Sequence, residues 1–310
     1  MNKRDKVHVL ARPPPKWYPR SMREEKKIVR QFYEEYGWEK AGPDAYQDTK
    51  AFVDTRSVMG AYHERCMRRL GDHFAAGGRR FLDAGCGAIA SREYAALSDR
   101  HEHRFCVDFS GAALREARKT LGDRAFCVQA DITRLPFRDN AFDAVLCAHV
   151  LYHVPADEQH DAMGELQRIL SPQGSGVVVY TWPDTLMNRI ALRLNPRLIA
   201  PGIPGLRWAW RTFFKRKSPA LTRPADNGMP AHPPLYFHPH PWRWFRAHVL
   251  PDVPFKLECW QSAGVPFSQA FIPNNRVGRV LLLILSVLES AFPWLMARIG
   301  TYPMFVLRKR

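Results

Sequence analysis

The sequence predicts an α/β protein built on a doubly wound, mainly parallel sheet. Short apolar runs alternate with helix-compatible segments from Phe81 to Trp182, as expected when each strand is followed by a crossover helix. The first run leads into a glycine turn, and the next two lead to an acid. Because parallel strands bring their carboxyl ends to one edge of the sheet, these features predict a ligand site at that edge.

The first strand and its turn are Phe81-Leu82-Asp83-Ala84-Gly85-Cys86-Gly87-Ala88, followed by a helix-compatible run from Ser91 to Asp99. Glycine at positions 85 and 87 permits backbone conformations and close ligand approach that a Cβ would block. The following helix N-terminus offers unpaired N–H groups. The turn therefore favours binding of a nucleotide-like cofactor.

The second strand, Arg104-Phe105-Cys106-Val107-Asp108, ends in a carboxylate suited to ribose hydroxyls. The third ends in Ala130-Asp131-Ile132, where the acid can accept from an exocyclic amine and the apolar side chain can cover a ring. The remaining core strands are predicted at 143–147 and 176–182, with a helix over 156–170 and a turn at Ser171-Pro172-Gln173-Gly174 between them.

Residues 79–182 resemble the class I S-adenosylmethionine-dependent methyltransferases, especially the small-molecule branch with type 11-like domains. The resemblance implies a Rossmann-like sheet of about seven strands with an antiparallel ending, completed here by strands at 255–260 and 302–307. It also implies S-adenosyl-L-methionine as cofactor and methyl transfer to O or C of a small or lipid-like acceptor. No metal is required.

The resemblance further implies roles for single residues. Asp83 would act near the methionine end through the hydrogen bonds of the turn, Asp108 would bind the ribose, and Asp131 with Ile132 would hold the adenine. The full set of expected cofactor-binding residues is Asp83, Ala84, Gly85, Cys86, Gly87, Ala88, Asp108, Phe109, Ser110, Asp131, Ile132, Ala148 and His149.

One position departs from the family pattern, because Ile89 stands where a third glycine is usual. A nicotinamide or flavin dinucleotide site is the competing interpretation of the turn, but G-x-G-x-x-G fails since position 90 is Ala. The acid that opens the turn, Asp83, and the Ala-Asp-Ile after the third strand favour the methyltransferase interpretation. A protein that retains the fold without the reaction is a further alternative, for which Ile89 is the sequence hint.

Two histidines follow the fourth strand and are candidate catalytic bases, His153 first and His149 second. In the alternative interpretation, His149 shapes the cofactor pocket and His153 packs or caps. His238 and His240 are looser candidates. The segment Ala148-His149-Val150-Leu151 lacks the Pro-Pro-aromatic signature common in enzymes that methylate exocyclic amines of nucleic acids, which favours a small-molecule acceptor.

The composition favours one elaborated domain: the chain has 310 residues, of which 46% are hydrophobic. We expect a basic N-terminal segment with cap helices at 1–75, the cofactor-binding core at 76–183, a basic and aromatic insertion or lid at 184–250, and C-terminal strands with an apolar helix at 251–310. The six cysteines lack zinc-ligand spacing, and residues 1–20 lack a signal-peptide core. We therefore expect a cytoplasmic protein with reduced thiols.

The formal net charge of +16 is concentrated in two appendages, residues 1–30 and 184–250. Within the second, Leu206 to Lys217 interleaves cations with Trp and Phe. Such a segment can settle on an anionic membrane, bind RNA, or form a solvated lid. Neighbouring apolar residues favour the membrane, so we expect peripheral association with an anionic membrane, with an RNA methyltransferase as the alternative.

Three helices are predicted outside the core. Residues 22–36 form an amphipathic helix of a kind that covers the active site in the family, and 51–70 form a second, on which Tyr62 is more consistent with core packing than with cofactor contact. Residues 277–300 form a strongly apolar helix, buried or interfacial, because Glu289 and Pro293 interrupt any membrane span.

Overall fold

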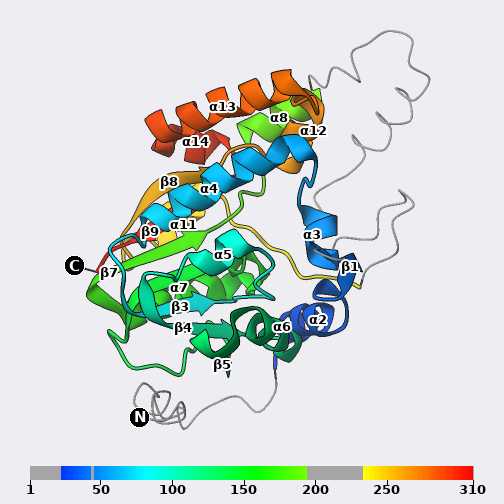
Figure 1. The fold of residues 1–310 in the computed structure, drawn as a ribbon. Coiled ribbons are helices and arrows are strands. Elements are labelled where there is room, and N and C mark those ends of the chain that lie inside the picture. The colour runs from blue at the N-terminus through cyan, green and yellow to red at the C-terminus, as the bar shows by residue number, and fades with distance from the viewer. Residues whose placement is uncertain (1–21, 43–44, 194–232, 310) are drawn as a thin grey trace.

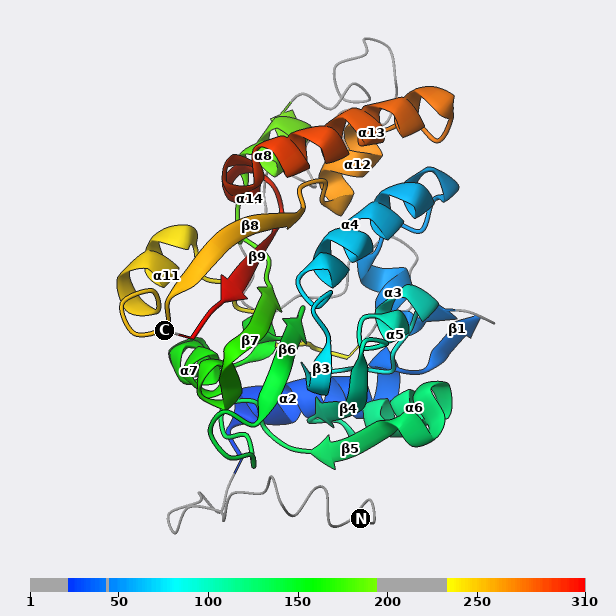
Figure 2. The same ribbon diagram turned by 60° about the vertical axis from the view of Figure 1, so that its left-hand side comes forward.

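The computed structural model describes residues 22–42, 45–193 and 233–309. The basic and aromatic run from Leu206 to Lys217 lies outside these residues, so its interpretation stays a prediction, as do the four expected segment boundaries. The described residues form a central sheet with helices on both faces and a further layer of helices beyond its antiparallel end (Figures 1 and 2).

The central sheet has seven strands in the order β5-β4-β3-β6-β7-β9-β8. Strands β5, β4, β3, β6 and β7 pair in parallel, whereas β9 runs antiparallel to both β7 and β8. This confirms the predicted Rossmann-like architecture. The bounds are β3 Gly78–Ala84, β4 His101–Asp108, β5 Ala125–Gln129, β6 Phe142–Ala148, β7 Leu170–Val179, β8 Phe255–Gln261 and β9 Tyr302–Leu307. A separate antiparallel pair joins β1 Lys40–Gly42 to β2 Ala45–Tyr46.

The helices alternate with the strands through the core and then gather at the C-terminal end. The α-helices are α2 Glu24–Phe32, α3 Gln47–Phe52, α4 Gly60–Asp72, α5 Arg92–Ala96, α6 Gly111–Leu121, α7 Gln159–Ile169, α8 Leu186–Arg193, α11 Trp242–His248, α12 Val265–Phe271, α13 Arg276–Ala291 and α14 Pro293–Ile299. A π-helical turn, η1 Tyr33–Gly37, continues α2, and short 3-10 turns lie at Ser57–Met59, Gly122–Arg124, Leu151–His153 and Ala156–Glu158.

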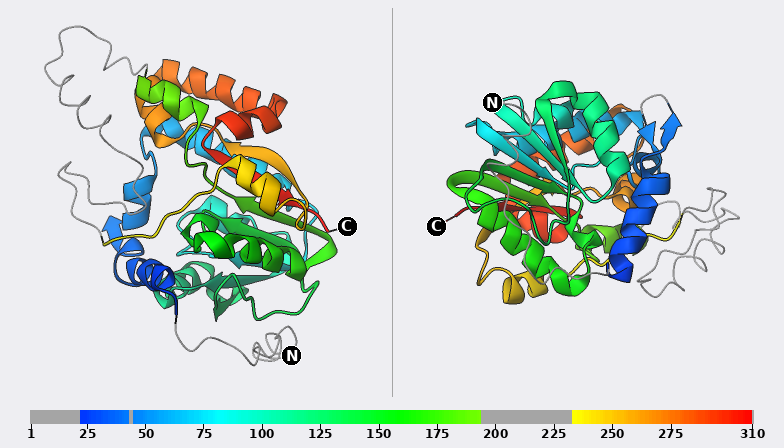
Figure 3. Two further views of the ribbon diagram at one scale, coloured as in Figure 1. Left: turned by 180° about the vertical axis from the view of Figure 1, so that it is seen from behind. Right: turned by 90° about the horizontal axis from the view of Figure 1, so that it is seen from below.

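Alternating side chains of each strand supply cores on opposite faces of the sheet, as strand geometry requires. Leu82 of β3 packs in one cluster with α7 and α11, whereas its neighbour Phe81 packs with α4. Helix α6 covers the same side as α4, against Cys106 of β4. Viewed from below, the sheet is enclosed between these helix layers (Figure 3).

The strand order reverses between β3 and β6. From β3 the chain proceeds outward to β4 and β5, then returns to place β6 on the other side of β3. In a doubly wound sheet such a switch point opens a crevice at the carboxyl ends of the strands. The glycine turn after β3 and the segment after β6 therefore face the same crevice.

The structure corrects three predicted elements. The helix expected over 51–70 is interrupted, because Val53 is extended and Asp54 binds the Arg56 guanidinium, so α4 begins only at Gly60. The turn expected at 171–174 lies within β7 as an irregularity, since Phe142 pairs with Leu170 but Ala144 with Ser175. Tyr62 is fully buried in a helix-packing cluster, in agreement with a core role.

The third correction concerns the helix expected over 277–300. It consists of α13 and α14, which meet at an angle of 117° next to Pro293. Proline lacks the N–H that would continue the hydrogen-bond ladder and is favoured at the start of a helix, so it ends one helix and opens the next. Among the described residues no single helix is long and apolar enough to span a membrane. Only α13 and α14 taken together have the length and composition of a span.

Candidate functional site

A cavity of about 940 Å³ lies at the carboxyl ends of β3, β4 and β6. One part of its wall is the glycine turn with the residues that follow the strands, and another comes from α2, η1, α3 and α4. Near β8 the wall includes Trp260, and Leu235 and Phe237 add apolar side chains from the segment before α11. The volume lies at the upper end of the range for small-molecule pockets.

The glycine turn has the backbone that its sequence predicts. Gly85 and Gly87 adopt φ of 76° and 58°, in the left-handed region that favours glycine. A Cβ on Gly85 would lie 2.3 Å from Cγ2 of Val150, so this position also lacks room for a side chain. Ile89 has a φ of 54°, which is an outlier for a β-branched residue. The missing third glycine thus leaves the backbone path intact at the cost of local strain.

Asp83 lies below the turn, outside the cavity lining. Its fully buried carboxylate accepts from the Arg104 guanidinium at 2.5 Å and from the Tyr94 hydroxyl at 2.9 Å. Burial raises the pKa of the Asp83 carboxyl, and the Arg104 cation opposes that shift. The carboxylate thus joins β3 to β4 and α5 beside the turn, and its expected role near the methionine end stays a prediction. Ala84 also lies outside the lining.

Asp108 links two loops of the cavity wall. One carboxylate oxygen accepts from the backbone N–H of Gly87 at 2.9 Å, and the other accepts from the N–H of Ser110 at 2.8 Å. Burial raises the pKa of the Asp108 carboxyl to about 6, against the effect of these hydrogen bonds. A carboxylate offers about four lone-pair positions, so acceptor capacity remains for ligand hydroxyls.

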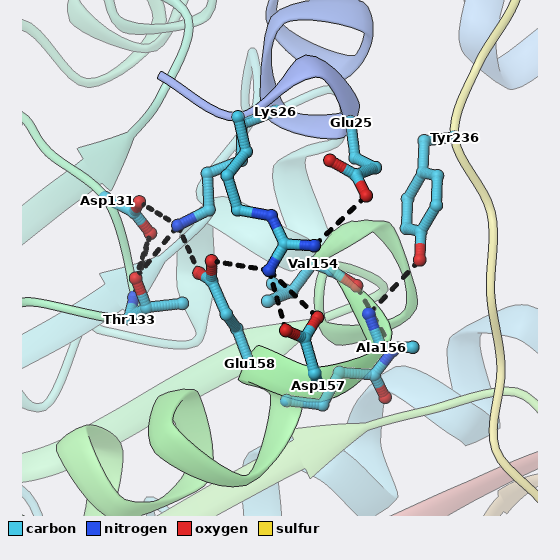
Figure 4. Close-up of polar contacts among 11 residues, drawn as sticks. Glu25, Lys26, Asp131, Thr133, Val154, Ala156, Asp157, Glu158 and Tyr236 are labelled. Atoms are coloured by element: carbon cyan, nitrogen blue, oxygen red, sulfur yellow. Dashed lines mark hydrogen bonds and ion pairs between the residues drawn. The ribbon is translucent and has the colours of Figure 1, made fainter. Parts of the chain in front are cut away.

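Asp131 is joined to the N-terminal helix. The Lys26 ammonium lies 2.6 Å from Oδ2 of Asp131, and the backbone N–H and hydroxyl of Thr133 both donate to Oδ1 (Figure 4). Lys26 also pairs with Glu158. An adenine amine at Asp131 would therefore share the carboxylate with Lys26, a partner that the sequence did not indicate.

His149 lies among aromatic rings at the end of β6. Its ring centroid is 4.8 Å from that of Trp260 and 5.3 Å from that of Tyr302, with both contacts edge-on. Burial lowers the pKa of His149 to about 4, so the ring is neutral near pH 7. These contacts are those of a residue that shapes the cavity wall, which was the alternative interpretation of this histidine.

His153 occupies a polar corner of the cavity. Its Nδ1 lies 2.7 Å from the carbonyl oxygen of Tyr236, which can only accept, so Nδ1 carries the proton and Nε2 carries the lone pair. Burial lowers the pKa of His153 to about 4. The Tyr33 hydroxyl lies 3.4 Å from Nε2 of His153 and 3.4 Å from Oδ1 of Asp48, whose pKa burial raises to about 6.

Comparison with known proteins identifies the core. Residues 82–178, from β3 into β7, match the protein family described as "Methyltransferase domain". These residues form a class I methyltransferase domain. The family match contains the glycine turn, both acids after the neighbouring strands and the histidines after β6, so this part of the cavity wall belongs to the domain.

Individual relatives of the methyltransferase domain cover part of the chain. A demethylmenaquinone methyltransferase from Clavibacter sepedonicus is 35% identical over 129 residues, 41% of this chain and 51% of that protein. Sterol 24-C-methyltransferase ERG6B from Gibberella zeae is 28% identical over 171 residues, 50% of this chain and 41% of that protein. The chain thus spans about half the length, or less, of these relatives. A solved structure titled "DhpI-SAH complex structure" shares the fold, with a TM-score of 0.53 at 12% identity, covering 93% of this chain and 98% of that chain.

S-adenosylmethionine is the cofactor of the methyltransferase domain, and the residues present fit it. Gly85 and Gly87 give the turn the positive φ angles that its path requires, and Asp108 presents a buried carboxylate with spare acceptor capacity. The indole N–H of Trp38, beside Gly87, is buried without a hydrogen-bond partner in the described part of the chain. The expected residues that line the cavity are Gly85, Cys86, Gly87, Ala88, Asp108, Phe109, Ser110, Asp131, Ile132, Ala148 and His149, whose individual contacts with the cofactor remain predictions.

Sequence reasoning missed Tyr33, Asp48 and Lys26. Tyr33 is the first residue of the π-helical turn that follows α2. Asp48 lies on α3, a short helix within a stretch whose sequence is typical of a polar loop. Glu34 anchors the turn by accepting from the backbone N–H groups of Gly111 and Ala112 at the start of α6. The signal for Lys26 and Tyr33 was the amphipathic pattern of residues 22–36, since the family resemblance implied a helix of this kind over the active site.

Proposed function

We propose that the protein is an S-adenosylmethionine-dependent methyltransferase that acts on an oxygen or carbon of a small or lipid-like acceptor. The cavity carries this proposal, because it extends from the glycine turn to His153 and includes apolar side chains such as Phe52, Val53 and Phe237. The relatives support it through their names, which specify a quinone-type and a sterol acceptor.

The bound cofactor supplies an electrophilic methyl group on a sulfonium. The protein must align the acceptor with that methyl group and exclude water, since positioning accounts for much of the rate. The glycine turn and Asp108 fix one reactant, and the apolar wall before α11 encloses the other. The acceptor proton becomes strongly acidic as the new bond forms, so a weak base suffices to remove it.

His153 is the base in this proposal. The lone pair on Nε2 takes the acceptor proton, while Nδ1–H continues to donate to the Tyr236 carbonyl. Near pH 7 the Asp48 carboxylate accepts a hydrogen bond from the Tyr33 hydroxyl, which leaves a lone pair of the Tyr33 oxygen facing Nε2 of His153. The protonated ring then gains a hydrogen bond to Tyr33 that the neutral ring lacks. The distances of 3.4 Å are long, as catalytic hydrogen bonds often are without ligand.

A product-tracing experiment tests the reaction. Purified protein and methyl-labelled S-adenosylmethionine are incubated with a cell extract, which is then separated into apolar organic, polar small-molecule and RNA fractions. We expect label in the apolar organic fraction. Label in RNA alone would support the RNA methyltransferase alternative, and cofactor binding without any transfer would support a non-catalytic protein.

A pair of histidine variants tests the base. His153→Ala should lower turnover by roughly a hundredfold while leaving cofactor affinity nearly unchanged. His160→Ala is the matched control, because His160 lies outside the cavity lining, where it pairs with Asp252. The rate should also fall below about pH 6 as Asp48 is protonated, and Asp48→Asn should remove that dependence. Equal losses in both histidine variants would refute the assignment.

A further inference from the structure

The helix pair α13–α14 exposes an apolar face on the outside of the molecule. Seven aliphatic side chains of α13 are between 40% and 60% exposed, and Phe292, Trp294 and Leu295 continue the surface past the bend. The aliphatic residues are Val277, Val280, Leu281, Leu283, Ile284, Val287 and Leu288. Most recur at intervals of three and four, which places them along one side of the helix. A contiguous apolar surface of this kind on a folded protein marks an interaction site.

The opposite side of α13 packs against the rest of the protein and holds the helix in place. Leu282 packs with Val58 and Tyr62 in a buried cluster against α4, and Gly278 lets the helix approach Pro273 and Val58 closely. The exposed side is therefore not needed to hold α13 in place. Figures 1 and 3 show α13 and α14 at the periphery, with α8 beside them and the sheet on their inner side.

The exposed charges of α13 and α14 are of one sign. Arg276, Arg279 and Arg298 are exposed, and Arg298 lies 4.8 Å from the centre of the Trp294 ring. The single acid between residues 276 and 299 is Glu289, which is fully buried and bound to Arg69, Tyr62 and Ser262. The surface of the helix pair thus combines apolar side chains with cations and exposes no acid of its own.

We propose that the α13–α14 face docks onto the surface of an anionic phospholipid bilayer. An amphipathic helix that lies in the interface buries its apolar side among acyl chains, while arginines reach the headgroups and tryptophan occupies the boundary. A second copy of the chain is a poorer partner, because its face would offer the same arginines and no exposed acid to pair with them. This proposal rests on surface residues alone and is independent of the proposed methyl transfer.

Vesicle sedimentation of the full chain tests the proposal. Vesicles of phosphatidylcholine with phosphatidylglycerol should bind the protein, and vesicles of phosphatidylcholine alone should bind it much less. Replacing Val280, Ile284 and Val287 with Asp should lower the partition coefficient at least tenfold. The matched control places the same three charges elsewhere, at exposed Ala96, Thr120 and Gln173. If the Asp variant fails to fold, as judged by circular dichroism, the same three positions are changed to Ser.

A second set separates the contribution of charge. Arg276→Gln with Arg279→Gln should weaken binding to the anionic vesicles several-fold, and added salt should reduce the difference from the unaltered protein. Equal vesicle binding by the α13 variant and its matched control would overturn the proposal. So would a stable dimer in sedimentation velocity that the α13 substitutions convert to monomer without changing vesicle binding, because the face would then serve a second copy.

Discussion

Arg104→Met should strongly destabilise the protein, because it removes the partner of a buried carboxylate. The side chains of Arg104 and Asp83 are 2% and 0% exposed, and their closest N–O distance is 2.5 Å. Arg104 also donates to the carbonyl oxygens of Tyr94 and Ala95 and to the Ser98 hydroxyl, which ties α5 to the sheet beneath the glycine turn. Breaking one side of a buried pair typically costs about 3–5 kcal/mol.

The charge itself accounts for much of this expected loss. Replacing Asp83 with Asn in the same protein removes the stranded charge while an amide oxygen can still accept from Tyr94. The double variant Asp83→Asn/Arg104→Met should therefore recover at least half of the lost free energy of unfolding. Both variants lack the hydrogen bonds from Arg104 to the carbonyl oxygens of Tyr94 and Ala95, so the free energy of unfolding should recover only in part.

Urea unfolding followed by circular dichroism measures both effects as changes in the free energy of unfolding. Arg124→Met is the matched control, because Arg124 pairs with Asp99 at 3.0 Å where both side chains are more than half exposed. Such a surface pair contributes about 0–1 kcal/mol. A loss below about 1 kcal/mol for Arg104→Met, or a double variant as unstable as the single one, would refute the reasoning.

Three further predictions concern the cavity. Asp108→Ala should lower the affinity for S-adenosylmethionine by tenfold or more in calorimetry. The change removes the expected ribose acceptor, and it leaves the N–H groups of Gly87 and Ser110 unpaired at about 1–3 kcal/mol each. Unchanged affinity in a folded variant would exclude Asp108 as a ligand. Burial holds the pKa of His153 at about 4, below its ordinary value of 6.5, so the unfolded chain binds the proton more readily and His153 should lower stability by up to about 3 kcal/mol as pH falls from 6.5 to 4. His153→Gln should reduce the decline in pH-dependent unfolding by this amount, while His149, whose pKa is also about 4, keeps its own share. An unchanged slope would contradict the burial of a neutral His153 ring. Gly85→Ala should destabilise the protein through its positive φ and the contact with Val150. Adding Val150→Ala should remove the two closest contacts, which are with the Val150 methyl carbons, but leave the backbone strain of about 1–3 kcal/mol. Complete recovery in thermal unfolding would show that φ is not a constraint there.

The arrangement of the sheet and the position of the cavity follow largely from local sequence. Each core strand is a short apolar run, and the switch from strand to helix periodicity is visible around residues 81–182. Glycine at 85 and the acid at 108 have backbone and chemical requirements that few other residues meet. Because parallel strands bring their ends to one edge, linear order alone was enough to place these residues at a common site.

Contacts between distant segments required the tertiary structure. Nothing local connects Tyr33 and Asp48 to His153, or Lys26 to Asp131, since these pairs are formed by packing the N-terminal segment across the carboxyl edge of the sheet. The bend next to Pro293 does have a local cause, the proline itself. Which side of α13 is exposed, however, depends on what packs against the helix. One side of that helix meets α4 and the other meets solvent. Hydrophobicity alone would assign the two sides the other way round, because the buried side includes Gly278, Ser286 and Glu289 whereas the exposed side is aliphatic.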